Sequence, residues 1–352
     1  MNPAEAVAPL RVREDAKADA VEAFVAVHPD STPFHRPVWL EAIEAGTGQR
    51  GHMLTAERGG RIEGVLPLTA VRSALFGKAL VSSGFAVSGG VLAESEAAAE
   101  ALVAAAWELA ERLGIPGLEL RGGPLPEGEG WAQRRGAHAG FVRPLAADDE
   151  SELKAIPRKQ RAEVRKALAG ELEVSVGRSE ADRRAHYAVY AESVRNLGTP
   201  VFPRALFAAV LDRFGEEADI LTVRHRGRPV ASVLSLYHKG AVMPYWGGGT
   251  WGARALRANE LMYFALMRHA RERGCARFDF GRSKLDSGAF AYKKNWGFAP
   301  VPLDYAIRTA DGAEPREVNP LSPRYRARIA LWKKLPLWLA NRLGPPIARG
   351  LG

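Results

Sequence analysis

The feature that most constrains the fold of this 352-residue chain is an internal repeat. The segment LTAERGGRIEGVLPL (54–68) aligns with LTVRHRGRPVASVLSL (221–236) with one gap. Each segment is an apolar run, a Gly-Arg turn and a second apolar run, a pattern that predicts a β-hairpin. Because such self-similarity indicates a duplicated structural unit, we expect the chain to contain the same unit twice.

A second pair of segments matches without gaps and extends the repeat. ALVAAAWELAERLGIPGLELRGG (101–123) corresponds to LMYFALMRHARERGCARFDFGRS (261–283). Both have apolar residues at helical spacing, then Gly114 or Gly274 where a helix end favours glycine, then a short strand. Each unit is therefore predicted to contain a hairpin, a loop, a helix and a strand.

The repeat divides the chain into four predicted parts. A first unit covers residues 1–145, a basic linker helix 146–170, a second unit 171–312 and a basic amphipathic tail 313–352. A hairpin that precedes a helix and a further strand predicts an α/β (α+β) fold, with a mixed, mostly antiparallel sheet flanked by helices in each unit.

Charge and composition narrow the possible functions. The net charge of +9 permits phosphate-bearing partners such as tRNA, nucleotide sugars or anionic lipid. Base-reading signatures are missing, so sequence-specific nucleic-acid binding is not expected. The single cysteine, Cys275, excludes an intramolecular disulfide and multi-cysteine metal sites. With no signal-peptide pattern and no apolar run of roughly 18 residues, we expect a cytoplasmic protein that contacts a membrane at most through its surface.

A glycine run follows the second hairpin and precedes a helix. Gly247, Gly248 and Gly249 lead into TWGARALRANELMYFALM, where Asn259 is placed to cap the helix. Gly-rich backbone at a helix N-terminus can hold phosphate or an oxyanion, so the three glycines are candidate donor-binding residues. The run satisfies a dinucleotide fingerprint only formally, since a hairpin precedes it. Hydrolase, zinc-protease and P-loop motifs are missing.

The order of these elements, twice in one chain, resembles the Fem family of tandem GNAT acyltransferases. The resemblance covers essentially the whole chain, most closely the branch associated with exosortase and exopolysaccharide loci. It rests on FHRPVWLEAI, GVLPL with LFGKALVSSGFAVSGGVLA, PRKQRAEVRKA, NLGTPVFPRALF, PYWGGG and FDFGRSK…GAFAYKKNWGF, and on the tail from NPLSPRYRARIALWKK onward. It implies transfer of an acyl or aminoacyl group to an amine, with acyl-CoA or aminoacyl-tRNA as co-substrate and no tightly bound cofactor or metal.

The resemblance also implies which residues lie near the reaction. An aromatic-Lys pair in a short helix lies close to donor and acceptor in the family, and Tyr292 and Lys293 match it here. Lys293 could stabilise an oxyanion, although a cation in the last turn also suits a helix C-terminus. Asp279, near the end of the preceding strand, could accept a proton. Its counterpart in the first unit, Glu119, suggests a structural role as the alternative.

Further candidates come from positions where the two units differ. Arg282, Ser283 and Lys284 align with uncharged residues of the first unit, which favours them as acceptor-binding or anion-binding residues. Arg195 and Thr199 line the acceptor side by resemblance. The aromatic residues Tyr245 and Trp246 precede the glycines and either contact the donor or fill the seam between the units.

Two basic segments have two interpretations each. The linker helix over 154–169 either binds phosphate or is a solvated face. The tail alternates Arg and Lys with large apolar residues, and either lies at an anionic inner leaflet or packs on the body of the protein.

The sequence thus predicts an acyltransferase that acts on an amine of an envelope polysaccharide or peptidoglycan precursor. A GNAT-type N-acyltransferase that uses acyl-CoA and acts on a sugar or small amine is one alternative. A non-catalytic scaffold of exopolysaccharide machinery is the other.

Overall fold

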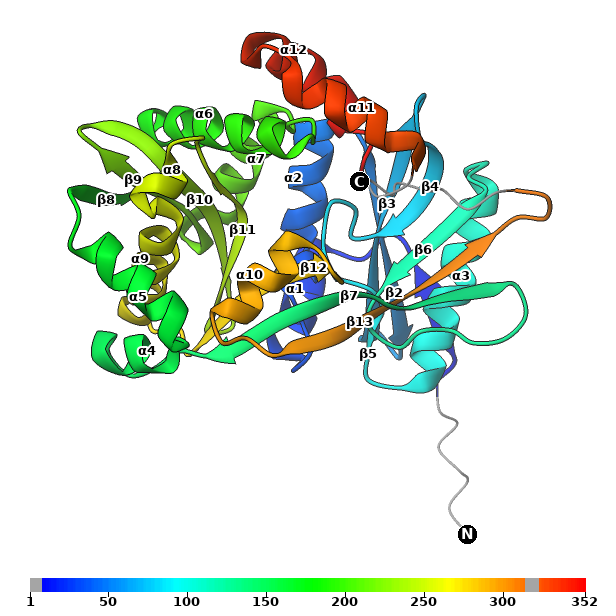
Figure 1. Cartoon of the computed structure of the whole chain (residues 1–352). Helices are drawn as coiled ribbons and strands as arrows, with labels where there is room; N and C mark the ends of the chain where they lie inside the picture. Colours follow the sequence, from blue (N-terminus) through cyan, green and yellow to red (C-terminus); the bar gives the residue numbers. More distant parts are fainter. Residues whose placement is uncertain (1–7, 314–322) are drawn as a thin grey trace.

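A computed structural model describes residues 8–313 and 323–352 of the chain. One mixed, mostly antiparallel sheet runs through both predicted units, with helices packed against it (Figure 1). The predicted fold class is confirmed. None of the described helices is long and apolar enough to cross a membrane.

The strands are β1 (Leu10–Arg13), β2 (Arg50–Arg58), β3 (Arg61–Ser73), β4 (Gly77–Ser82), β5 (Leu92–Ala93), β6 (Gly117–Arg121), β7 (Trp131–Pro144), β8 (Leu172–Gly177), β9 (Ala218–His225), β10 (Arg228–His238), β11 (Ala241–Gly249), β12 (Arg277–Lys284) and β13 (Pro300–Thr309). The helices are α1 (Ala18–Val27), α2 (Pro37–Thr47), α3 (Glu96–Arg112), α4 (Asp149–Ala155), α5 (Arg158–Leu168), α6 (Glu180–Leu197), α7 (Arg204–Phe214), α8 (Ala253–Leu256), α9 (Ala258–Glu272), α10 (Gly288–Asn295), α11 (Pro323–Lys334) and α12 (Leu337–Ala348), with short 3-10 turns at Pro33–His35 and Gly215–Glu217.

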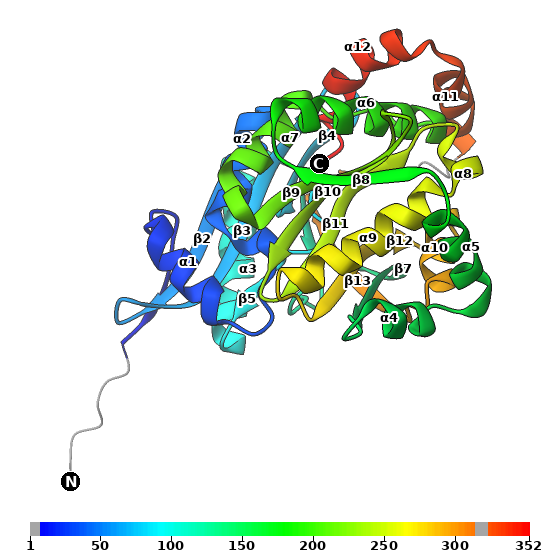
Figure 2. The ribbon, with the colours of Figure 1, turned by 90° about the vertical axis from the view of Figure 1, so that its left-hand side faces the viewer.

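The internal repeat of the sequence is visible in the elements. β2 and β3 form the first hairpin and β9 and β10 the second. α3 leads into β6 as α9 leads into β12, and both helices are followed by glycines with positive φ, 61° at Gly114 and 80° at Gly274. α9 lies across the strands of the second unit (Figure 2). The local structure of both copies therefore matches the prediction.

The two units exchange their last strands, which the sequence does not predict. The order along the sheet is β1-β2-β3-β4-β6-β13-β7-β12-β11-β10-β9-β8. β13, at the end of the second unit, pairs with β6 of the first, and β7, at the end of the first unit, pairs with β12 of the second. The ends predicted at 145 and 312 follow these two strands, so each unit completes the sheet of the other.

The predicted linker helix is two helices. α4 ends at Ala155 and α5 begins at Arg158, and Ile156 between them is extended, with φ −74° and ψ 132°. Pro157 explains the break, because a residue that precedes proline is disfavoured in the helical region. One face of α5, with Gln160, Val164 and Ala167, is buried, while its cations are mostly exposed.

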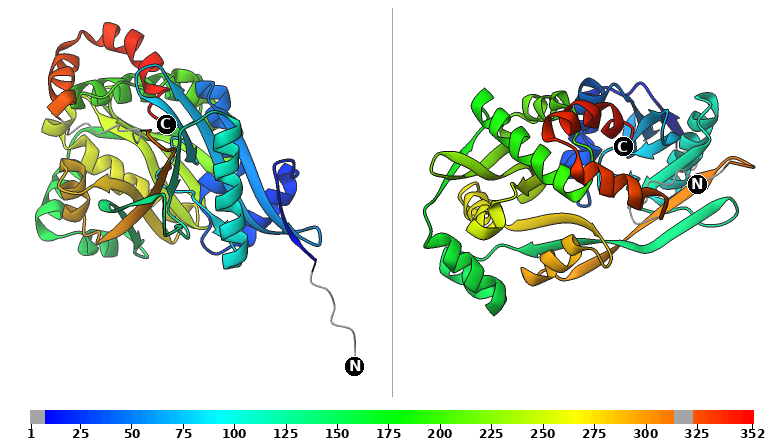
Figure 3. Two further views of the ribbon diagram at one scale, coloured as in Figure 1. Left: turned by 90° about the vertical axis from the view of Figure 1, so that its right-hand side faces the viewer. Right: turned by 45° about the horizontal axis from the view of Figure 1, so that its top comes forward.

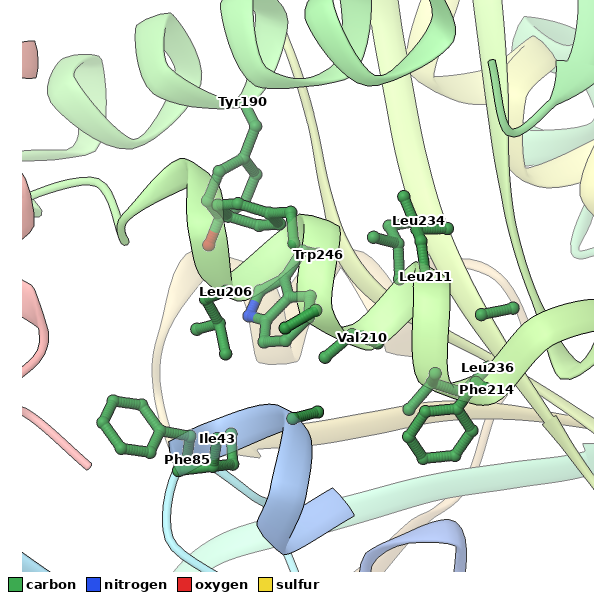
Figure 4. Close-up of a cluster of buried hydrophobic side chains, with 14 of the residues drawn as sticks. Ile43, Phe85, Tyr190, Leu206, Val210, Leu211, Phe214, Leu234, Leu236 and Trp246 are labelled. Carbon is green, nitrogen blue, oxygen red and sulfur yellow. The ribbon is translucent and has the colours of Figure 1, made fainter. Parts of the chain in front are cut away.

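An aromatic-rich core fills the seam between the units. Residues from α2 and the loop after β4, such as Ile43 and Phe85, lie in the same cluster as residues from α6, α7 and β11 (Figure 4). Trp39 is fully buried there and stacks with Trp246 at 6.2 Å between ring centroids. This shared core makes the two units one body.

The C-terminal helices pack across the top of both units (Figure 3, right). The buried face of α12 consists of Ala340, Gly344 and Ala348. A Cβ added at Gly344 would lie 3.0 Å from the backbone nitrogen of Val201, so only a small residue permits this contact. The last residue, Gly352, is buried. Residues 314–322 of the predicted tail lie outside the described part of the chain.

Candidate active site

β11 and β12 are parallel neighbours that pair only at one end. Their two residue pairs are Ala241 with Arg277 and Val242 with Phe278. Beyond these pairs β11 continues beside β10 alone and β12 beside β7 alone. A Cβ added at Gly281 would meet no other atom within 4 Å, so there is free space beside the backbone of β12 where the strands diverge.

The corresponding strands of the first unit also diverge, but the chain itself packs into their junction. β4 and β6 pair at Leu80 with Leu118 and at Val81 with Glu119. The loop after β4 then packs against the end of β6, since a Cβ on Gly90 would lie 1.9 Å from the carbonyl oxygen of Gly122. In the second unit the chain after β11 instead turns away into α8 and α9. This difference makes the second unit the candidate site.

The structure corrects the prediction of a glycine loop after the second hairpin. Gly247, Gly248 and Gly249 belong to β11 and pair with residues of β10. A Cβ at Gly248 would lie 2.2 Å from the Oγ atom of Ser193 on α6, so close packing by a helix explains the glycine. Asn259 does not cap α9 either, because the N-cap is Arg257, whose φ is 56°.

Lys293 lies where the two strands diverge. Its ammonium donates hydrogen bonds to the carbonyl oxygens of Gly281, at 3.2 Å, and Arg282, at 2.9 Å. It also lies over the rings of Phe141 and Phe280 at about 5.5 Å. Burial lowers the pKa of Lys293 to about 8, against the opposing effect of Asp279. Its neighbour Lys294 is exposed.

Asp279 has a different environment from its counterpart in the first unit. Burial raises the pKa of Asp279, although the N–H of Gly281 donates a hydrogen bond to its carboxylate at 2.8 Å and Lys293 is close enough to oppose the shift. Burial acts in the same direction on Glu119, but the Arg121 guanidinium, 2.7 Å away, outweighs it and lowers the pKa. Glu119 is thus a partner in a buried ion pair, whereas Asp279 has no such cation within salt-bridge distance among the described residues.

Asp279 also faces open space. A pocket of about 250 Å³ is lined by β10, β11, β12 and the loop that carries Pro29 to Pro33. Asp30, His238 and Asp279 are among its polar residues. Burial lowers the pKa of His238 to about 4, so this imidazole is neutral at pH 7. The pocket combines residues of both units at the carboxylate of Asp279.

Tyr292, which precedes Lys293 on α10, packs against aromatic side chains of α9 and β12. Its ring packs with Phe280 and Tyr263, at centroid distances of 6.4 and 6.0 Å. Burial raises the pKa of Tyr292 well above its ordinary value, and the negative charge of Glu260 adds to the shift. Glu260 lines a groove of about 780 Å³ at the start of α9. Tyr292 is thus near Glu260 of this groove, and Lys293 is near Asp279 of the other pocket.

The groove contains residues that the sequence analysis did not single out. Its lining consists of Glu163, Trp251, Arg254, Ala255, Arg257 and Glu260. The Trp251 side chain is 83% exposed, and Arg257 is paired with Glu163 at 2.5 Å. Although Glu163 and Glu260 also line the groove, Arg254 and an exposed indole beside a helix N-terminus suit a nucleotide that carries phosphate groups. The Trp and the two Arg residues of TWGARALR are the sequence signal for this groove.

Arg282 points to the seam rather than toward Lys293. Its guanidinium donates a hydrogen bond to the Tyr305 hydroxyl at 2.5 Å, and that hydroxyl donates to the carbonyl oxygen of Val87. His138 stacks on Tyr305 at 5.4 Å. Burial lowers the pKa of His138 to about 4, and the charges of Arg282, Lys284 and Arg121 add to the shift. The positive charges of Arg282, Lys284 and Arg121 thus lie close to His138.

The cluster of Arg282, His138 and Tyr305 is called the seam cluster. Strand exchange explains why the sequence does not predict most of it. His138 lies on β7 and Tyr305 on β13, so they meet only because the two last strands pair with each other. Lys284 pairs in register with His138, on the same side of the sheet. Ser283, predicted beside them, is buried, and its hydroxyl has no hydrogen-bond partner among the described residues.

Four predicted residues lie away from this arrangement. Tyr245 and Trp246 fill the seam core, where the Tyr245 hydroxyl donates to the carbonyl oxygen of Phe85 and Trp246 is 5% exposed. Of the two interpretations of this pair, the structure shows the seam. Arg195 donates to the carbonyl oxygen of Lys333 in α11, and Thr199 is an exposed residue beyond the end of α6.

Comparisons with known proteins agree with this architecture. Residues 155–294 match the family model of the acetyltransferase (GNAT) domain. The fold is similar to the crystal structure of FemX, with a TM-score of 0.66, 16% identity, and coverage of 84% of this chain and 96% of that one. It is also similar to a tandem GNAT protein from the clavulanic acid biosynthesis pathway (TM-score 0.56, 14% identity, coverage of 87% and 100%). L-PGS from Bacillus licheniformis gives a TM-score of 0.52 at 13% identity, with coverage of 91% and 98%.

A search of curated proteins finds no match. The family match covers the divergent strands, the groove and α10, and the structural neighbours share the arrangement of both units. Residues 155–294 therefore form an acetyltransferase (GNAT) domain, and the fold of the chain is similar to that of FemX and of a tandem GNAT protein.

Proposed function

We propose that this protein transfers an acyl or aminoacyl group onto an amine of an envelope polysaccharide or peptidoglycan precursor. The observation that carries the proposal is the pair Tyr292 and Lys293 on α10, because Tyr292 is near Glu260 of the groove and Lys293 is near Asp279 of the pocket. Two concave regions, each near one of two adjacent residues of a short helix, suit a reaction between two substrates. We place the reaction in the cytoplasm, where activated acyl donors are made.

The chemistry needs few groups beyond those described. The acceptor nitrogen attacks the donor carbonyl, a C–N bond forms, and the C–S or C–O bond to the leaving group breaks. Lys293 would stabilise the oxyanion that develops on the carbonyl oxygen. The proton of the amine would pass to Asp279, whose raised pKa favours proton acceptance, or to the leaving group. Holding both substrates in place supplies much of the rate.

The donor would lie in the groove, with its nucleotide at Trp251 and Arg254. Both acyl-CoA and the end of an aminoacyl-tRNA carry an adenosine with phosphate groups, so this chemistry serves either donor. The acceptor would reach Lys293 from the side of Asp279. The cations of the seam, Arg282 and Lys284 among them, would bind its phosphate or carboxylate groups.

An acyl-CoA-dependent N-acyltransferase that acts on a sugar or small amine is the second candidate. The match of residues 155–294 to the acetyltransferase (GNAT) model favours it, because GNAT domains use acyl-CoA. The linker favours it as well, since α4 and α5 are too short to form a long helical arm for tRNA.

One assay tests both donors. Purified protein is incubated with acetyl-CoA or with aminoacyl-tRNA, together with glucosamine or a UDP-linked muropeptide, and transfer of the labelled acyl group is measured. We expect transfer by the wild type and its loss in Lys293→Ala combined with Arg282→Ala. The matched control Lys294→Ala, at the exposed neighbour, should retain activity. If cells with the double variant make as much polysaccharide as cells with the wild type, that result would support the non-catalytic scaffold instead.

A further inference from the structure

The outer faces of α11 and α12 carry large apolar side chains that the described residues leave exposed. Leu331 is 65% exposed, Trp338 69% and Leu343 44%. Leu197, at the end of α6 beside this segment, is 69% exposed. Most large apolar side chains of the described chain are buried, so four exposed ones in one region form an unusual surface.

These side chains are exposed even though the tail is packed against the body of the protein. The opposite face of α12 is buried against the body, and Gln49 donates a hydrogen bond to the carbonyl oxygen of Arg349 at 2.8 Å. Arg121 donates to the carbonyl oxygen of Gly352 at 3.1 Å. The helices are therefore held with one face packed and the other turned outward (Figure 3).

The charge of this segment is of one sign. Residues 323–352 contain seven Arg and Lys and no Asp or Glu. The described cations Lys334 and Arg342 are exposed and lie on the same helices as Leu331 and Trp338. Neither forms an ion pair with another described residue. Apolar side chains mixed with cations and free of acids match the interface of a bilayer that contains anionic lipid.

We propose that the outer face of α11 and α12 binds the surface of an anionic lipid bilayer. Trp338, Leu331 and Leu343 enter the region between headgroups and acyl chains, and Lys334 and Arg342 contact lipid phosphates. Both predicted roles of the tail then apply, because one face packs on the body of the protein and the other binds the bilayer. This surface goes beyond acyl transfer and does not depend on it.

The proposed lipid-binding surface lies near the residues around Arg282. The tail spans both units, and its last residue reaches Arg121, close to the positively charged seam around Arg282. A bilayer bound to the outer face lies on the side of the molecule that α11 and α12 cover.

Vesicle flotation with the full-length protein tests the proposal. Vesicles of phosphatidylglycerol and phosphatidylethanolamine are compared with vesicles of phosphatidylcholine at 0.1 M salt. We expect binding to the anionic vesicles only, weakened at 0.5 M salt because the charges are screened. Lys334→Gln with Arg342→Gln should lower the partition coefficient about 30-fold, since each cation near the surface contributes roughly fivefold. Trp338→Ser with Leu331→Ser should lower it at least tenfold.

Matched variants distinguish this surface from general stickiness. Val27→Ser on α1 removes a side chain that is 75% exposed, far from the tail, and Arg158→Gln with Lys159→Gln removes two exposed cations of α5. Both should bind vesicles as the wild type does. Thermal melting of the tail variants should match the wild type, because the altered side chains are exposed. Wild-type protein that stays unbound, or tail variants that bind normally, would overturn the proposal whatever the result of the acyl transfer assay.

Discussion

At the scale of single residues, corresponding positions of the two units have different surroundings. Glu119 and Asp279 occupy the same place in the repeat, yet one is held in an ion pair with Arg121 and the other borders a pocket. The sequence shows the equivalence of the two acids but not their different partners. Only the packing around each carboxylate distinguishes the acid of a buried ion pair from the acid that borders a pocket.

Lys293 should give the protein a measurable pH dependence of stability. Its folded pKa of about 8 lies below the ordinary value of 10.5, so the unfolded chain binds this proton more tightly between these pH values. Stability of the wild type relative to Lys293→Met should therefore rise from pH 8 to pH 10.5, by at most about 1.4 kcal/mol per pH unit. Urea unfolding at pH 7, 8, 9 and 10 measures the difference. A difference that stays constant would show that Lys293 is not buried as described, and Lys294→Met controls for the loss of one cation.

At the scale of elements, the sequence predicts what is local and misses what depends on neighbours. The hairpins, α3, α9 and the strands after them follow from periodicity and glycine placement. The glycines of β11 were predicted as a loop because their contacts with α6 and α9 are invisible in the sequence. Tyr245 and Trp246 likewise became core residues because α2 of the other unit packs against them.

The loop that packs into the junction of β4 and β6 should be sensitive to one methyl group. Gly90→Ala places a Cβ 1.9 Å from a backbone oxygen, so the loop must move, and we expect a loss of stability of about 2 kcal/mol or more. Gly288→Ala is the matched control, because a Cβ there meets no atom within 4 Å. Thermal melting compares the two. Equal melting temperatures would mean that the first unit is not closed by this loop.

At the scale of the whole molecule, the exchange of β7 and β13 makes the units interdependent. A fragment of residues 1–145 lacks the β13 that pairs with β6 and leaves β7 without its partner β12. We expect this fragment to be insoluble or unfolded alone, and to form a folded complex when co-expressed with residues 146–352. Size-exclusion chromatography and circular dichroism test this. A first fragment that folds alone would contradict the exchanged sheet.

The sequence could predict two copies of a unit and a GNAT domain in the second, because these follow from local patterns and from resemblance. It could not predict the seam cluster of Arg282, His138 and Tyr305, whose members come from three strands brought together by exchange. The groove at Trp251 and Arg254 likewise depends on how α8 and α9 are placed after β11.

The central claim is that the second unit binds the acyl donor and the first does not. Hydrogen-deuterium exchange with and without a non-hydrolysable acyl-CoA analogue, and in parallel an aminoacyl-adenosine analogue, tests it directly. We predict that one of the two donors slows exchange in residues 245–260 and 279–294, with no change in residues 82–95 and 119–123. Protection confined to the first unit, or no protection by either donor, would contradict the account.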